Sequence, residues 1–205
     1  MDIQLNFIND SDDVNNSDVV VFAPSHTGPG DLPVAWLVIQ NCGRGDHHPF
    51  VYPVTSGVVA ADSSGNYSPE LPASGGEAFA MVRDPSGDVL KATGRSNFFP
   101  HIEVANQLPN GTIDAYLCKD GQPCLAKMGL SPGESVVFEP PAQLWFLVAS
   151  QVQQGKLINS AVVEARPPFE VTLAGIASAD IVMRGGGDGP DAKPFSFTLQ
   201  NVVQA

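Results

Sequence analysis

Proline and glycine recur along this chain at intervals too short for a long helix. There are 18 prolines and 20 glycines. They interrupt every window long enough for an amphipathic helix, because proline lacks an amide donor and glycine favours irregular backbone. Between these breaks lie short runs rich in β-branched and aromatic residues, which are typical of strands. The pattern therefore predicts an all-β protein.

Strands and turn signals alternate at nearly regular spacing, which indicates a β-sandwich or a barrel. We predict one large antiparallel β-sandwich domain over residues 1–205, of jelly-roll or immunoglobulin-like type. The alternative is two small packed β-sandwiches that divide near the Ser-, Gly- and Pro-rich segment 63–76. No sequence repeat is strong enough to indicate a duplicated domain or a propeller.

The order of strands and loops follows from the positions of these breaks. Apolar and polar residues alternate in 2–8, which predicts a half-buried strand. Loops are expected at 9–18 and 25–33, and hairpin turns at Asp84–Gly87 and Asp120–Gly121. The other strands are expected at 18–23, 34–39, 50–62, 78–82, 89–92, 102–108, 112–118, 124–128, 135–139, 143–149, 160–164, 169–173, 180–183 and 195–203.

The charge balance limits the class of partner. The net charge is −12, with only 10 lysines and arginines. Nucleic acids and anionic membranes both bind basic surfaces, so neither is an expected partner. Charged residues make up 16% of the chain, below the usual quarter. A surface with so few charges suits close packing against another surface, because fewer charges must be desolvated.

The N-terminal residues and the cysteines indicate a compartment. Asp2 follows Met1 at once and no apolar leader comes after it, so we expect a cytoplasmic protein, with leaderless export left open. The odd count of three cysteines leaves at least one free thiol, as in a reducing compartment. A two-residue turn at Asp120–Gly121 would pair Cys118 with Pro123 and not with Cys124, and reduced thiols are the expectation.

The densest group of reactive side chains follows the apolar strand 34–39. The Gly-rich segments 41–49 and 184–192 are expected to form one recognition rim, because binding residues gather on loops held by rigid strands. The candidate ligand-binding residues are Arg44, Asp46, His47, His48, Tyr52, Asp188 and Asp191.

Cys42, His47 and His48 form a candidate copper or zinc site, since thiolate and imidazole bind both metals. Adjacent histidines on a regular strand point to opposite faces, so joint ligation requires a loop conformation. A polar turn with histidines bonded to the backbone is the alternative. Acidic segments at 10–18 and 185–191 offer oxygen ligands for calcium, but they lack the EF-hand spacing.

Catalysis has weak support in the sequence. A thiolate–imidazole pair could form between Cys42 and either His47 or His101, but no GxSxG elbow is present. We therefore predict a non-enzymatic protein. No resident cofactor is expected beyond the calcium, copper or zinc alternatives.

The predicted function is ligand binding or self-assembly. Alternating strands at 3–7 and 195–199 are candidates for sheet edges, through which the chain could form a homo-oligomer. The alternative is a carbohydrate-binding, lectin-like module, with or without calcium, in which aromatic residues stack on sugar rings. A copper- or zinc-dependent enzyme that uses the 41–49 loop is the third candidate.

Overall fold

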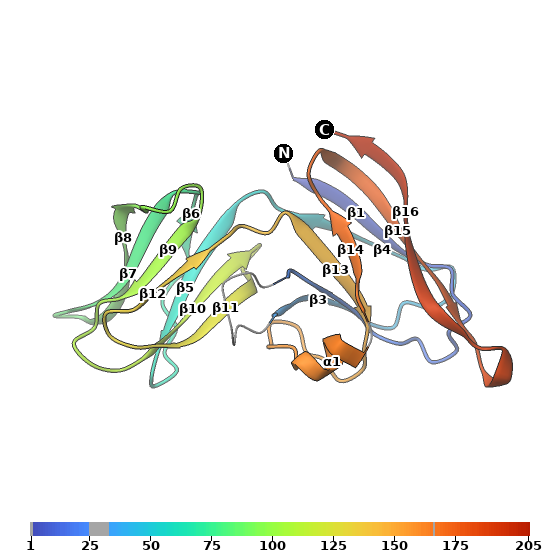
Figure 1. Cartoon of the computed structure of the whole chain (residues 1–205), viewed down its shortest axis with the longest axis horizontal. Helices are drawn as coiled ribbons and strands as arrows, with labels where there is room; N and C mark the ends of the chain where they lie inside the picture. Colours follow the sequence, from blue (N-terminus) through green and yellow to red (C-terminus); the bar gives the residue numbers. More distant parts are fainter. Residues whose placement is uncertain (1, 25–32, 166) are drawn as a thin grey trace. The chain divides into compact units, whose positions relative to one another are not determined.

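The structure is a computed structural model that describes residues 2–24, 33–165 and 167–205, and it confirms an all-β protein (Figure 1). Most of the loop expected at 25–33 lies outside the described residues. The strands form four four-stranded sheets, and within the described part of the chain none closes into a barrel. The described residues contain two helical segments, α1 (Ser160–Ala165) and η1 (Gly189–Asp191). Among the described residues, no helix has the length and apolarity to cross a membrane.

The chain divides into two compact units. Unit 1 comprises the described residues of Met1–Pro24, Ala35–Val54 and Ala142–Ala205. Unit 2 comprises those of Ser25–Val34 and Thr55–Pro141. The segment 63–76 therefore lies inside unit 2.

Unit 1 contains two sheets. In the first sheet only β1 and β15 run parallel, and every pair in the second is antiparallel. The first sheet has the order β16 (Lys193–Gln204), β15 (Ile176–Gly186), β1 (Ile3–Asn9) and β4 (His47–Tyr52). The second has the order β14 (Phe169–Thr172), β13 (Gln143–Val148), β2 (Val19–Phe22) and β3 (Ala35–Ile39).

Unit 2 also contains two sheets. In the first sheet only β7 and β9 run parallel, and every pair in the second is antiparallel. The first sheet has the order β8 (Gly87–Arg95), β7 (Glu77–Asp84), β9 (Ile102–Asn106) and β12 (Ser135–Phe138). The second has the order β6 (Leu71–Ala73), β5 (Ser56–Asp62), β10 (Ile113–Lys119) and β11 (Gln122–Leu130).

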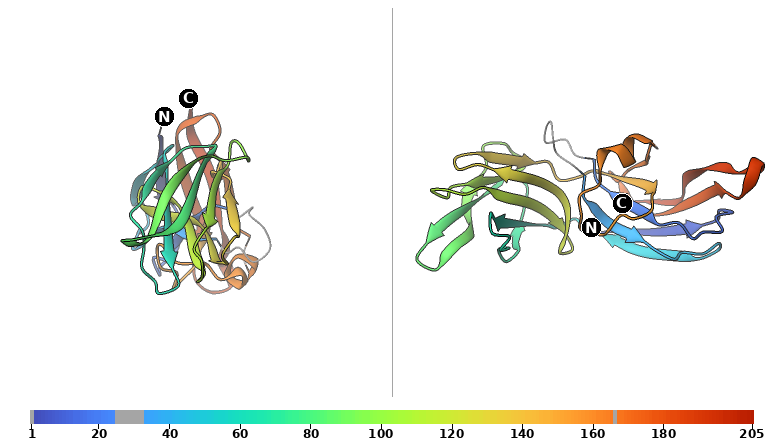
Figure 2. Two further views of the ribbon diagram at one scale, coloured as in Figure 1. Left: turned by 90° about the vertical axis from the view of Figure 1, so that its left-hand side faces the viewer. Right: turned by 90° about the horizontal axis from the view of Figure 1, so that it is seen from below.

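The two units share one topology. Strands β1–β4 of unit 1 occupy the same positions and directions as β9–β12 of unit 2, and β13–β16 correspond to β5–β8. Unit 1 therefore contains the first four strands of the chain (β1–β4) and the last four (β13–β16). Unit 2 contains the eight strands between them (β5–β12). In unit 2 the residues 96–101 join β8 to β9. In unit 1 the equivalent β16 and β1 carry the two chain ends, which lie close together (Figures 1 and 2).

The interior of each unit is apolar. Phe7 and Phe22 are fully buried in unit 1, as Phe79 and Phe138 are in unit 2. Strand β1 buries its alternate apolar residues, which confirms the predicted pattern. Burial of such side chains contributes roughly 1.5–3 kcal/mol each.

Both predicted hairpin turns are confirmed. Asp84 pairs with Gly87 between β7 and β8, and Lys119 pairs with Gln122 between β10 and β11. Asp120 and Gly121 have φ values of 52° and 71°, which suit the central positions of a type I′ turn.

Four expectations about the strands are wrong. Residues 50–62 do not form one strand: β4 ends at Tyr52, before Pro53, and β5 begins at Ser56 in a sheet of the other unit. The sheets are not fully antiparallel, because β1 and β15 are far apart in the chain and no hairpin fixes their relative direction. Strand β1 lies inside its sheet and not at an edge. Residues 160–164 form helix α1, since Asn159 caps its N-terminus by accepting the Ala161 amide at 2.9 Å.

Candidate functional site

The segment 41–46 is fastened to the end of strand β1. The Gly45 amide donates to the Asn9 carbonyl at 2.6 Å, and the Asn9 amide donates to the Asp46 carbonyl at 3.1 Å. The Asn9 side chain is buried and donates to the Cys42 carbonyl at 2.6 Å. Gly45 has a φ of 84°, which favours glycine. The loop is thereby held at the end of the sheet where β1 finishes and β4 begins.

The segment 184–192 is fastened to the same stretch of chain. The Asp12 amide donates to the Gly185 carbonyl at 2.7 Å, and Arg184 forms an ion pair with Asp10 at 3.0 Å. Arg44, from the first loop, forms an ion pair with Asp12 at 2.6 Å. Both predicted rim segments therefore contact the residues that follow β1, at one end of unit 1.

The predicted residues occupy different positions around this rim. Arg44 is exposed beside Asp12, and the Asp46 carboxylate accepts the Gly43 amide at 2.9 Å, which shapes the turn. Asp188 and Asp191 are exposed on the second segment. Tyr52 lies at the opposite end of β4, buried against Trp36 with ring centroids 5.3 Å apart. Tyr52 is therefore not brought to the rim.

The expected metal ligands do not converge. His47 and His48 are the first two residues of β4, which begins earlier than expected, so their side chains point to opposite faces. The His47 ring lies 3.3 Å from the Asn6 amide group. Burial and the neighbouring Asp46 raise the pKa of the Cys42 thiol, so its thiolate form is disfavoured. Across residues 2–24, 33–165 and 167–205, no three potential metal ligands are grouped.

The acidic segment after β1 uses its carboxylates within the fold. Asp10 and Asp12 are ion-paired as described. The Asp13 carboxylate accepts the Asn15 amide at 3.0 Å and the Ser17 amide at 2.6 Å. Burial alone would raise the pKa of Asp13, but these hydrogen bonds lower it below its ordinary value. Asp13 therefore stays ionised and shapes its own turn.

Unit 2 repeats the bonds that hold the rim. The Gly133 amide donates to the Asn106 carbonyl at 2.8 Å, and the Asn106 amide donates to the Glu134 carbonyl at 2.9 Å. The Asn106 side chain donates to the Leu130 carbonyl at 2.8 Å, as Asn9 does to Cys42. Asn9, Gly45 and Asp46 of unit 1 thus have the same hydrogen bonds as Asn106, Gly133 and Glu134 of unit 2. Because the arrangement recurs in both units, we infer that its role is structural.

The remaining rim residues are particular to unit 1. The strand registers β1–β4 and β9–β12 identify the equivalent positions in unit 2. These positions hold Pro132 for Arg44, Ser135 for His47 and Val136 for His48. The positions equivalent to Asp10 and Arg184 are Gln107 and Val82. These charged and histidine residues therefore distinguish this end of unit 1 from the equivalent end of unit 2.

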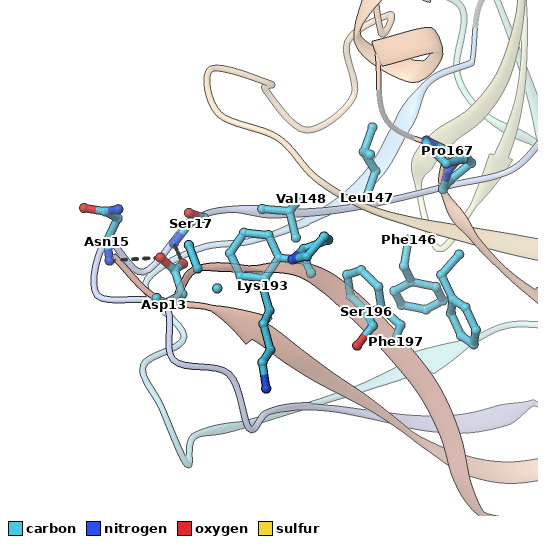
Figure 3. A pocket seen from close by; sticks show the side chains of 17 residues that line it. Asp13, Asn15, Ser17, Phe146, Leu147, Val148, Pro167, Lys193, Ser196 and Phe197 are labelled. Atoms are coloured by element: carbon cyan, nitrogen blue, oxygen red, sulfur yellow. Dashed lines mark hydrogen bonds between the residues drawn. The ribbon is translucent and has the colours of Figure 1, made fainter. Parts of the chain in front are cut away.

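A pocket of about 840 Å³ adjoins the rim of unit 1, between strands β13, β14 and β16 (Figure 3). At one end, Phe197 stacks on Phe169 with ring centroids 5.8 Å apart and lies 6.3 Å from Phe146. At the other end lie Asp13 and Asn15 (Figure 3). The volume lies within the range of small-molecule sites.

The walls of this pocket combine apolar side chains with nearly as much polar surface, and Lys193 lies between the two ends (Figure 3). Phe146 and Phe169 could not be assigned to a site from the sequence, because they are separated from β16 along the chain. The alternation of apolar residues at 195–199 predicts an edge strand, and it also places Phe195 and Phe197 on one face, the pattern that could have indicated the pocket. The further lining residues are Ser17, Leu147, Val148, Pro167, Pro168, Gly186, Gly187, Ala192, Pro194, Phe195 and Ser196.

Among the described residues that line the pocket, the charged ones are Asp13 and Lys193. Asp188 and Asp191 are exposed on the segment between Gly187 and Lys193, two other residues of the lining. Arg44 and Arg184 of the rim form ion pairs with Asp12 and Asp10.

Comparison with protein-family models, curated proteins and solved structures finds no match to this chain. The function is therefore inferred from geometry and chemistry.

The thiols of unit 2 are expected to be inert in the folded protein. Cys118 and Cys124 are free and buried, and burial raises the pKa of each thiol to about 12. The Cys124 thiol also donates to the Leu117 carbonyl at 3.3 Å. At pH 8 we expect reaction with a disulfide reagent such as dithionitrobenzoate to be at least ~100-fold slower than in urea. Fast reaction of two thiols in the native state would contradict this placement.

Proposed function

We propose that this protein is a non-enzymatic binding protein whose unit 1 pocket holds an aromatic or alkyl ligand that carries a positive charge. In this proposal each unit is a small β-sandwich, and the pocket lies between the two sheets of unit 1. The observation that carries it is the stack of phenylalanine rings in a pocket that Asp13 also lines, next to the segment that carries the exposed Asp188 and Asp191. Such a site offers apolar contact to the ligand body and an acidic rim to its cation.

The competing functions have less support in the geometry. A lectin-like site needs exposed aromatic rings, but Trp36 and Tyr52 are buried against each other. Tyr67 is exposed, but it lies in unit 2 beside Tyr116, with ring centroids 5.9 Å apart. A copper or zinc enzyme needs converging ligands, whereas His47 and His48 point to opposite faces of β4.

Calorimetric titration of the full chain with octyltrimethylammonium tests the proposal. Octyl sulfate and octyl glucoside have the same chain without the positive charge, so both should bind more weakly. Phe197→Ala removes the central ring of the pocket and should weaken binding at least about tenfold. Phe99→Ala is the matched control, because it removes an equal ring that is 80% exposed in unit 2.

The charge of the rim is tested separately. Asp188→Asn combined with Asp191→Asn removes two exposed carboxylates without touching the pocket walls, and should weaken binding of the cation about threefold at low salt. Equal binding of the three octyl compounds would refute the charge selectivity. Unchanged binding by Phe197→Ala would refute the pocket.

A further inference from the structure

Strand β16 forms a long, open edge of the first sheet of unit 1 (Figure 1). It has 12 residues, none of its side chains is buried, and within the described part of the chain it pairs only with β15. After Lys193 it carries no charged residue up to Gln204. Val202 and Val203 are 40% and 55% exposed. An uncharged edge with unpaired backbone groups can accept another strand.

The equivalent edge of unit 2 is protected. Strand β8 carries Asp88, Lys91 and Arg95, and Lys91 forms an ion pair with Asp84 at 2.9 Å. Charged residues, lysine above all, are the usual means by which proteins prevent edge strands from pairing. Two edges with the same place in one topology therefore differ in charge, and β16 lacks the protection.

The two edges can be aligned residue by residue. Met183 of β15 and Met81 of β7 correspond, because each pairs with the anchoring asparagine of its unit, Asn9 or Asn106. One residue earlier, Val182 pairs with Thr198 and Ala80 pairs with Lys91. Thr198 therefore occupies the edge position that lysine occupies in unit 2.

We propose that β16 pairs antiparallel with β16 of a second copy of this chain, about a two-fold axis at Thr198. This register places Phe197 opposite Leu199 of the second copy and Ser196 opposite its Gln200. The half-buried apolar residues then meet on one face and the polar residues on the other, as favourable cross-strand pairs require. The same patch serves both copies, which is the condition for a closed dimer.

The net charge of the chain opposes dimerisation, and the uncharged edge limits that repulsion at the contact itself. Each copy has a net charge of −12, so two copies repel one another at long range. The pairing segment Ser196–Gln200 contains no charged residue and is regularly paired with β15, whereas Asn201, with a φ of 49°, interrupts the edge. The charged group next to Thr198 is Arg184, which donates to the Thr198 hydroxyl at 3.4 Å and forms an ion pair with Asp10. Added salt should therefore tighten the dimer by screening the remaining repulsion. The pairing uses the backbone groups of Ser196–Gln200 and does not require an occupied pocket, although the Ser196 and Phe197 side chains also line that pocket.

Sedimentation or light scattering of the full chain over a concentration series tests the proposal. The wild-type mass should rise from 21.5 kDa to twice that value, more readily at high salt. Thr198→Lys copies the residue of β8 into β16 and places two lysines at the two-fold axis, so dimerisation should weaken at least about tenfold. Ser64→Lys adds the same charge to an exposed turn of unit 2 and should dimerise as the wild type does.

Each outcome decides the proposal. It is supported if Thr198→Lys remains monomeric where the wild type and Ser64→Lys are dimers, and if amide exchange at Ser196–Gln200 slows with concentration. A wild type that is monomeric at all concentrations and salt levels would overturn it. So would a Thr198→Lys variant that dimerises as tightly as the wild type, because the contact would then lie elsewhere.

Discussion

Replacing Asn106 with alanine is expected to destabilise unit 2 by about 3 kcal/mol. The Asn106 side chain is fully buried and donates to the carbonyls of Gly111 and Leu130 at 2.9 and 2.8 Å. It also accepts the Leu108 amide at 3.0 Å. Alanine leaves these three backbone groups without their partner, and each buried, unpaired group costs roughly 1–3 kcal/mol.

Unit-resolved amide exchange measures this effect, because a chain with two compact units need not unfold in one transition. Asn106→Ala should raise exchange most in β9–β12, whereas Asn9→Ala should raise it most in β1–β4. Asn110→Ala, in the exposed turn next to the anchor, is the control and should change stability by less than about 0.5 kcal/mol. If Asn106→Ala were as mild as Asn110→Ala, the anchoring role would be refuted.

Replacing Gly185 with alanine is expected to destabilise unit 1 by about 3–4 kcal/mol. Gly185 has a φ of +93°, and an added Cβ would lie 2.2 Å from the Pro194 carbonyl oxygen. Relief requires the start of β16 to move away from β15. Because Pro194 and Phe195 line the pocket, binding of octyltrimethylammonium should weaken as well.

Gly187→Ala is the matched control for this clash. Gly187 has a nearly equal φ of +91°, but an added Cβ would approach no atom closer than 3.9 Å. Gly187→Ala should therefore lower the free energy of unfolding of unit 1 by the backbone strain alone, about 1–2 kcal/mol. Urea unfolding followed by signals from unit 1 separates the two variants. Equal destabilisation by both would show that the contact with Pro194 has no energetic effect.

Local features of the fold could be predicted from the sequence. Proline and glycine spacing indicated strands, and Asp120–Gly121 indicated a tight hairpin, because both signals act within a few residues. Helix α1 was missed, since six residues rich in valine show no helical period and depend on the Asn159 cap.

The pairing of distant strands could not be predicted in the same way. Each unit takes strands from both halves of the chain, and partner choice among distant strands depends on packing and not on local preference. The anchoring asparagines illustrate this limit. Asn9 and Asn106 each end a strand, but their shared role is visible only once Gly45 and Gly133 lie against them.

The candidate site was predicted in part. Both rim segments meet the residues after β1, so their shared location follows from the parallel pairing of β1 with β15. Tyr52 was misplaced, because the length of β4 carries it to the far end of the sheet. The phenylalanines of the pocket come from three strands, and no local pattern connects them.

Backbone amide NMR of the full chain during titration with octyltrimethylammonium tests the central claim most directly, which is that unit 1 holds a cationic apolar ligand in its pocket. We predict shift changes at Phe146, Val148 and Phe197 and along 13–17, with little change in unit 2. Octyl sulfate should cause much smaller changes at the same residues. Shifts confined to exposed apolar residues of unit 2, or absent from the pocket residues at saturation, would contradict the proposed function.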